Sequence, residues 1–253
     1  MKTKNIYNES FYNEMKKNTD QATNKSSAEL IVPYILQLFP NTQSVVDFGG
    51  AIGIWARAFL DCGIEDVHVI DGNWVNKEKL EIPETCFETF DFSKQTYKPI
   101  RKYDIAMSLE VAEHISAEKA DLFVKSLVDS SDVIIFSAAI PAQGGTGHIN
   151  EQPQSYWKKK FEKYGYKAID PIRGEFQNDF KVQTHYRQNM IVYVKNIDNY
   201  TEIKRFANSN FVADFVCPEY AYLLHETNTW KHLFSVQWVL IKKMVEKLFH
   251  LKQ

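Results

Sequence analysis

The chain has 253 residues, enough for one α/β domain of ordinary size and a modest appendage. Its hydrophobic content of 44% and aromatic content of 14% are ample for a packed core and exclude global disorder. The formal net charge is −2, from 30 basic and 32 acidic residues. Because nucleic-acid-binding proteins usually carry a basic excess, this balance favours a small or neutral substrate.

The three cysteines, Cys62, Cys86 and Cys217, are scattered and show no CxxC spacing. Such a set suits a reducing compartment and offers neither a disulfide framework nor a thiolate zinc site. No apolar stretch approaches the ~20 residues of a spanning helix, and no apolar signal segment follows the first lysines. We therefore expect a cytoplasmic protein without a membrane span.

Strands and helices alternate along most of the chain. An S-x-x-E capping box at Ser26–Glu29 predicts the start of an amphipathic helix that stops near Pro40. The expected helices are Leu30–Phe39, Ile52–Cys62, Ser116–Val128 and Ser155–Tyr164. The expected strands are Ser44–Phe48, Val67–Ile70, Cys86–Phe90, Asp104–Leu109, Val133–Ser137 and Asn189–Val194. Continuous apolar strands separated by helices indicate an α/β fold with a mostly parallel sheet covered on both faces.

Three regions are expected along the sequence. Residues 1–40 form a polar arm and a cap helix, residues 41–195 form the α/β domain, and residues 196–253 form a helical extension. Within the extension, Trp230–Leu251 has apolar side chains at helical spacing and several lysines. We prefer packing on the core or on a second subunit, as in a homo-oligomer, to a membrane-surface helix.

A glycine-rich turn follows the first expected strand. In open parallel sheets, ligands bind at the carboxyl ends of the strands, and glycines let the backbone approach a ligand closely. The GxGxxG pattern of dinucleotide folds fails here, because Ala51 and Ile54 occupy two of its three glycine positions. A D-x-G-x-G-x-G pattern is in register at Asp47, Gly49, Ala51 and Gly53. This loop resembles that of class I S-adenosylmethionine-dependent methyltransferases, from which only Ala51 departs, so the turn must tolerate a Cβ there.

Acidic residues end the next two strands. The Asp71 carboxylate can accept charge-assisted hydrogen bonds from the two ribose hydroxyls of a nucleoside. By the resemblance, Asp91 is placed to bind the adenine amino group, with Phe92 or Trp74 against the ring.

The segment Tyr103–Ile115 reads YDIAMSLEVAEHI. It resembles the YDhhhs-EVxEH block of class I methyltransferases, including small-molecule O-methyltransferases of the ubiquinone-pathway type. The resemblance covers roughly residues 26–195 and implies a Rossmann-like, seven-stranded sheet with S-adenosylmethionine over Gly49–Gly53 and an acceptor above Glu110–His114. The implied cofactor-binding residues are Asp47, Gly49, Gly50, Ala51, Gly53, Asp71, Gly72, Asp91, Phe92 and Glu110. The DPPY-type motif of amino-directed nucleic-acid methyltransferases is absent from this position.

Two histidines are candidates for activating the acceptor. An alcohol must lose its proton as it attacks the methyl group, and imidazole is suited to remove it. We favour His148 as the base over His114, with Glu113 assisting. If the stretch is helical, Glu110, Glu113 and His114 share one face and could, with His148, hold a divalent cation instead.

The acceptor is expected between the flexible loop Gly144–Gly147, Trp157 and the polar stretch Tyr186–Asn189. That stretch is expected to lead into the last strand. It resembles a segment of methyltransferases of bacterial surface-polysaccharide pathways. The Arg187 guanidinium could bind an anion there. The expected substrate-binding residues are Tyr186, Arg187 and Trp157. The favoured acceptor is an oxygen of a sugar, phosphate or phosphoramidate group. The alternatives are a protein or RNA methyltransferase and a non-catalytic, methyltransferase-like partner subunit.

Overall fold

The computed structural model describes residues 20–207 and 214–217. The chain divides into two compact units, Met1–Phe215 and Val216–Gln253. The polar arm before residue 20 and the expected helix Trp230–Leu251 lie outside the described residues. In the part that is described, no helix is long and apolar enough to cross a membrane.

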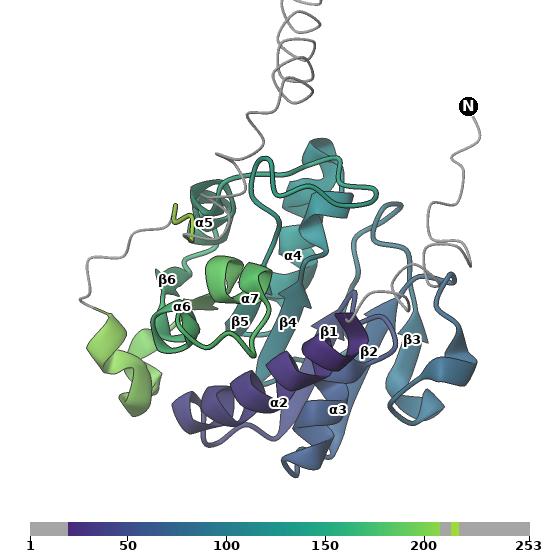
Figure 1. Ribbon diagram of the computed structural model, residues 1–253, viewed down its shortest axis with the longest axis horizontal. Helices are drawn as coiled ribbons and strands as arrows, with labels where there is room; N and C mark the ends of the chain where they lie inside the picture. Colours follow the sequence, from purple (N-terminus) through teal and green to yellow (C-terminus); the bar gives the residue numbers. More distant parts are fainter. Residues whose placement is uncertain (1–19, 208–213, 218–253) are drawn as a thin grey trace, which may run out of the picture. The chain divides into compact units, whose positions relative to one another are not determined.

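A seven-stranded sheet forms the centre of the first unit, in the order β3-β2-β1-β4-β5-β7-β6 (Figure 1). The first five strands are parallel: β1 Ser44–Phe48, β2 Asp66–Asp71, β3 Phe87–Thr89, β4 Ile105–Leu109 and β5 Val133–Ser137. The last two are β6 Lys167–Ile169 and β7 Ile191–Val194, and β7 runs antiparallel to both of its neighbours. The strand order reverses between β1 and β4, where open α/β sheets form a ligand crevice at the carboxyl ends. The expected Rossmann-like fold is confirmed.

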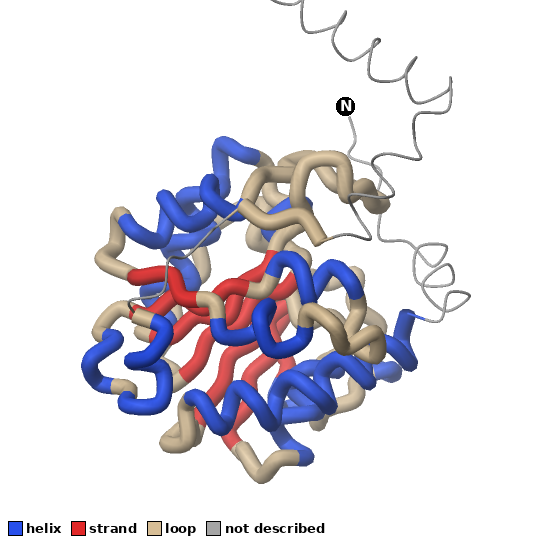
Figure 2. The backbone as a smooth tube through the Cα atoms, turned by 60° about the vertical axis from the view of Figure 1, so that its left-hand side comes forward, coloured by secondary structure: helices blue, strands red, loops and turns tan. Residues whose placement is uncertain are grey.

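Helices cover both faces of this sheet (Figure 2). One face packs against α2 Asp20–Leu38, α3 Ile54–Asp61, α6 Pro171–Phe176 and α7 Thr184–Asn189. The other face packs against α4 Ala120–Ser130 and α5 Gln154–Glu162. Along β1, Val45 faces the first layer and Val46 the second, so the strand is apolar at both positions.

The described elements also include six short 3-10 helices. They are Lys77–Lys79, Glu84–Cys86, Ala112–His114, Ala117–Lys119, Ile197–Asn199 and Thr201–Phe206.

The start of the first helix was predicted wrongly. Helix α2 begins at Asp20, so the Ser26–Glu29 capping box lies inside it. Ser27 is fully buried, and its hydroxyl accepts the Gln183 backbone N–H at 3.0 Å instead of capping a helix. Packing of the helix's apolar face, through residues such as Ile31, overrides the local capping signal.

The region between α5 and β7 was also incompletely predicted. No sequence pattern predicts β6, α6 and α7, which are only three to six residues long. The stretch Tyr186–Asn189, expected to lead into the last strand, ends α7 instead, and the strand begins at Ile191. Polar side chains in so short a helix give no apolar period by which it could be recognised.

Candidate functional site

The turn after β1 brings main-chain groups to the edge of the sheet. The Gly49 N–H donates to the Ile70 carbonyl of β2 at 2.7 Å. Gly49 and Gly53 have left-handed φ angles of 78° and 86°, which glycine adopts without strain. Ala51 is also left-handed, at φ 48°. The turn therefore does accommodate a Cβ at the position where the sequence departs from the family pattern.

Asp71, the last residue of β2, holds this turn in place. Its Oδ2 accepts the Ala51 N–H at 2.8 Å, and its Oδ1 accepts the Gly72 N–H at 2.6 Å. Burial raises the pKa of Asp71, and hydrogen bonds from Gly72, Ala51 and Trp74 oppose that rise. A Cβ on Gly72 would lie 2.2 Å from the Trp74 ring, so the indole covers the Gly72 backbone.

Asp47 lies beneath the same turn and is only 3% exposed. Among the described residues, no group donates a hydrogen bond to its Oδ2. Burial raises the pKa of Asp47 to about 7, and repulsion from Asp71 adds to the rise. A Cβ on Gly50 would lie 2.5 Å from Oδ2, so the glycine lets the turn close over this carboxylate.

Asp91 and Phe92 follow β3 with different surroundings. The Asp91 carboxylate accepts the Ser93 N–H at 2.9 Å and forms an ion pair with Lys94 at 2.7 Å. These contacts lower the pKa of Asp91 despite partial burial, which acts the other way. The Phe92 ring packs against Phe48 and Phe123, so it is a core residue and not the expected partner of an adenine ring.

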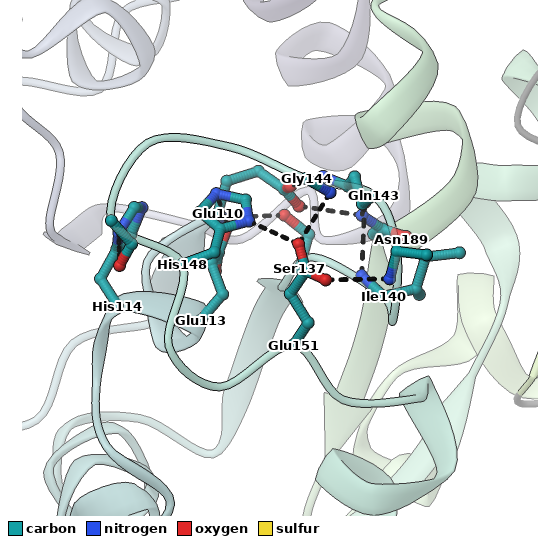
Figure 3. Close-up of polar contacts among 12 residues, drawn as sticks. Glu110, Glu113, His114, Ser137, Ile140, Gln143, Gly144, His148, Glu151 and Asn189 are labelled. Atoms are coloured by element: carbon teal, nitrogen blue, oxygen red, sulfur yellow. Dashed lines mark hydrogen bonds and ion pairs between the residues drawn. The ribbon is translucent and has the colours of Figure 1, made fainter. Parts of the chain in front are cut away.

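Glu110 follows β4 in a left-handed conformation, with φ 55°. Its carboxylate accepts from Gln143 Nε2 at 2.7 Å and from Asn189 Nδ2 at 3.2 Å, and Asn189 also donates to Gln143 Oε1 at 2.9 Å (Figure 3). The expected shared helical face of Glu110, Glu113 and His114 was wrong. The chain turns at Glu110 before the 3-10 helix begins at Ala112, so the Glu110 carboxylate is held by α7 and the β5–α5 loop.

Glu113, His114 and His148 do come together. One ligand atom from each lies within 4.8 Å of the other two, as metal ligands would. The imidazoles of His114 and His148 meet edge to face, with ring centroids 4.9 Å apart. His148 Nε2 lies 3.9 Å from Glu113 Oε1 (Figure 3). Of the four residues considered for a cation, the structure thus groups three and separates Glu110.

The charge state of this cluster follows from its burial. Glu113 is fully buried, and no described group donates a hydrogen bond of normal geometry to either carboxylate oxygen. Burial raises the pKa of Glu113 well above its usual range, Glu110 adds to the rise, and nearby backbone amides oppose it. Burial, followed by repulsion from His148, lowers the pKa of His114 to about 4. Its imidazole is therefore neutral at neutral pH, as a metal ligand requires.

The three expected substrate-binding residues are all buried. Trp157 is 1% exposed and packs in the core beneath β5, so it cannot contact an acceptor. Arg187 is 3% exposed, and its guanidinium donates to the carbonyls of Val182 and Gln177. Tyr186 accepts a hydrogen bond from Trp55 Nε1 at 3.3 Å. The expectation that Arg187 binds an anion was wrong, because its guanidinium donates hydrogen bonds to carbonyl groups of the loop that precedes α7.

Comparison with known proteins supports the interpretation of the loop and of the fourth strand. A family model described as a methyltransferase domain matches residues 21–123, a range that contains the glycine turn, Asp71 and the EVAEH segment. Residues 21–123 are therefore similar to a methyltransferase domain, and the sheet has the Rossmann-like methyltransferase fold. No protein of curated function matches the sequence.

Solved structures share this fold at low sequence identity. Magnesium protoporphyrin IX methyltransferase from Synechocystis, crystallised with bound SAH, is 15% identical, with a TM-score of 0.55 over 75% of this chain and 96% of that one. An O-methyltransferase family protein from Burkholderia thailandensis is 10% identical, with a TM-score of 0.50 over 69% of this chain and 59% of that one. At these identities the likeness concerns the fold alone.

The side-chain contacts of three polar residues near the site were not predicted from the sequence. Gln143 and Asn189 hold Glu110, and Glu151 contacts His148 Nδ1 at 2.9 Å. For Glu151 a signal existed, since an acid three positions after a histidine in a glycine-rich loop can reach its ring. For Gln143 and Asn189 there was none, because their contact depends on the packing of α7 against β5.

Proposed function

We propose that this protein transfers a methyl group from S-adenosylmethionine to a hydroxyl oxygen of a small polar acceptor. We further propose that Glu113, His114 and His148 hold a divalent cation at the acceptor's end of the site. The observation that carries this proposal is the fully buried Glu113 carboxylate, whose two oxygens accept no hydrogen bond of normal geometry from the described residues while two imidazoles lie beside it. Burying a carboxylate in this way is costly unless a cation or a proton compensates it.

The cofactor half of the proposal is supported by the turn between β1 and α3. Gly49 to Gly53 place main-chain groups where the strand order reverses, the usual ligand position in such sheets. Asp71 sits beside the turn with a buried carboxylate, suited to accept hydrogen bonds from ribose hydroxyls. Asp47, with one oxygen that lacks a described donor, lies beneath the turn, and above about pH 7, where it is ionised, its negative charge would favour a cofactor whose sulfonium is positive.

The acceptor half is supported by the chemistry of the donor set. One carboxylate and two imidazoles suit divalent first-row cations, and three protein ligands leave positions open for an acceptor oxygen. A cation bound there would lower the pKa of an acceptor hydroxyl and so favour its attack on the methyl group. The protein's own part is to align that oxygen with the sulfonium methyl, a contribution that can reach several kcal/mol.

The acceptor class proposed is a hydroxyl-bearing polar molecule such as a sugar. Glu110 and Gln143 lie in the same two segments as the three-residue cluster, those that follow β4 and β5, and both are hydrogen-bonded to Asn189 (Figure 3). The amide and carboxylate groups of these three residues match hydroxyl groups in hydrogen-bonding capacity. A phosphate or phosphoramidate acceptor is not part of the proposal, because Arg187, the residue expected to bind it, is buried among other partners.

Two titrations test the halves separately. Calorimetry with S-adenosylmethionine should show binding that is weakened in Asp71→Ala and retained in Glu113→Gln. Titration with Mn²⁺, followed by electron paramagnetic resonance, should show binding that is lost in Glu113→Gln and retained in Asp71→Ala. Glu118→Gln is the matched control for both titrations, because Glu118 is exposed and lies five residues after Glu113. A wild-type protein that binds no S-adenosylmethionine contradicts the first half, and one that binds no Mn²⁺ contradicts the second.

A further inference from the structure

Glu151 has no assigned part in the reaction, yet its side chain joins the whole loop between β5 and α5. The carboxylate accepts the N–H of Ala142 at 2.9 Å and that of Gly144 at 2.8 Å, from the outgoing arm of the loop. Its Oε1 also lies 2.9 Å from Nδ1 of His148, on the returning arm. The Glu151 carboxylate therefore contacts both arms of the loop and the His148 imidazole (Figure 3).

This contact determines which nitrogen of His148 carries the proton. An ionised carboxylate can only accept, so Nδ1 must donate to Glu151, and in the neutral ring the lone pair is then on Nε2. Nε2 is the atom that lies 3.9 Å from Glu113 Oε1. Two lone-pair-bearing atoms at this separation can both reach a cation, since such bonds are about 2.0–2.2 Å long.

His114 is held in the same way by the loop. Its Nδ1 lies 3.2 Å from the Gly147 carbonyl oxygen, which can only accept, so His114 also keeps its lone pair on Nε2. The loop is in turn fixed to the 3-10 helix that carries Glu113, because the Ile149 and Asn150 N–H groups donate to the Glu113 carbonyl at 2.9 and 3.0 Å. The two imidazoles are thus oriented by one loop.

Gly145 also restrains the His148 ring. A Cβ at this position would lie 2.2 Å from Nε2 and 2.4 Å from Cε1, so the loop backbone lies directly against the imidazole. Any side chain at position 145 would displace the ring. Glu151 and Gly145 together leave His148 little freedom to rotate, and its side chain is 13% exposed.

We propose that Glu151 is a positioning residue that holds His148 in the Nδ1–H tautomer and directs its Nε2 lone pair toward Glu113 and His114. Its importance for catalysis rests on the proposed function, because it acts only through His148. Carboxylates behind metal-binding histidines fix the tautomer and ring orientation in this manner.

The tautomer can be measured without metal, cofactor or acceptor. Long-range ¹H–¹⁵N correlation spectra of ¹⁵N-histidine-labelled full-length protein distinguish the two neutral tautomers, and His148→Ala assigns the signal. At about pH 8, where an ordinary histidine is neutral, we expect His148 to be protonated on Nδ1 in the wild type. In Glu151→Ala the population should shift toward the Nε2–H form. Glu151→Gln should restore the Nδ1–H form in part, because its amide oxygen still accepts.

Gln152→Ala is the matched control. Gln152 lies next to Glu151 and donates from its side chain to Asn150 Oδ1 at 3.0 Å, so its loss loosens the loop without touching His148. Its tautomer signal should equal that of the wild type. A wild-type His148 protonated on Nε2, or an unchanged tautomer in Glu151→Ala, would overturn the assignment.

A second readout links the tautomer to the proposed cation. The affinity for Mn²⁺ should fall roughly 10- to 100-fold in Glu151→Ala, the usual effect of removing such a partner, while calorimetry shows unchanged affinity for S-adenosylhomocysteine. Unchanged Mn²⁺ affinity in Glu151→Ala would overturn the positioning role at the cation. If the wild type binds no Mn²⁺ but His148 has the Nδ1–H form, the proposed function fails at the cation while the assignment of Glu151 stands.

Discussion

His148 Nε2 lies 3.9 Å from Oε1 of Glu113, although one residue follows β5 and the other follows β4. The parallel pairing of these strands, with Leu109 opposite Ser137, brings the two following segments to the same edge of the sheet. The pairing of adjacent strands thus creates the proposed acceptor end of the site. Because neither strand carries a cluster residue itself, the site depends on how the two loops fold back over the strand ends.

Replacing His148 should impair turnover without affecting the cofactor. His148→Ala should lower the rate of S-adenosylhomocysteine formation with a sugar acceptor by on the order of 10²–10⁴-fold, the usual range for a group that activates an acceptor. Calorimetric affinity for S-adenosylmethionine should stay near that of the wild type. His68→Ala, which removes a β2 histidine bound to Glu88, is the control. Full turnover in His148→Ala would show that His148 takes no part in the reaction. Full turnover of the wild type after EDTA treatment would show that no cation is needed, and would leave His148 only the role of a base.

Asp71 should be required for cofactor affinity. Asp71→Ala should weaken S-adenosylmethionine binding by about 1.5–3 kcal/mol, the scale of hydrogen bonds to a charged group, as measured by calorimetry. Asp66→Ala is the matched control, because Asp66 opens the same strand and pairs with Arg101 at the surface. Equal affinities in the two variants would place the ribose elsewhere.

The glycine turn should tolerate no side chain at position 49. In Gly49→Val the new Cβ would lie 2.5 Å from Val111 Cγ2, and the backbone would keep a φ of 78° that a β-branched residue avoids. We expect S-adenosylmethionine binding to be abolished. Gly63→Ala is the control for backbone strain alone, because Gly63 also has a left-handed φ, of 91°, but has open space around it. That variant should lose some thermal stability and keep its affinity, and binding retained in Gly49→Val would contradict the placement of the loop.

The buried Asp47 should make stability depend on pH. Its pKa is raised from 3.8 to about 7, so between these values the unfolded chain has released a proton that the folded chain still holds. The contribution of Asp47 to stability is therefore present below about pH 4 and is lost as the pH rises to about 7, by about 1.4 kcal/mol per pH unit at most. Asp47→Asn lacks this dependence, so urea unfolding should show its stability relative to the wild type increasing from pH 4 to pH 7. A constant difference across this window would show that Asp47 is ionised in the folded protein.

The cofactor half of the site could be predicted from the sequence because it is local. Asp47 and the turn that follows are contiguous, and Asp71 ends the neighbouring strand, so strand boundaries alone place them at one edge. The periodicity of the apolar runs predicted six of the seven strands to within one or two residues, with β1 and β5 matching their predicted bounds and only β6 missed.

The acceptor half could be predicted only in part. His114 and His148 were identified, but their grouping with Glu113 and the separation of Glu110 depend on a left-handed backbone at Glu110 that no residue type signals. Arg187 was misplaced for a related reason, because a short polar helix buried by tertiary contacts resembles a surface segment in sequence.

The most direct test of the account is a crystal structure of the protein grown with S-adenosylhomocysteine and Mn²⁺, with anomalous data collected to locate the metal. We predict the nucleoside over Gly49–Gly53 with its ribose against Asp71. We also predict one anomalous peak within roughly 2.0–2.3 Å of Glu113, of His114 Nε2 and of His148 Nε2. An anomalous map without a peak among these three residues, or S-adenosylhomocysteine bound away from the glycine turn, would contradict the account.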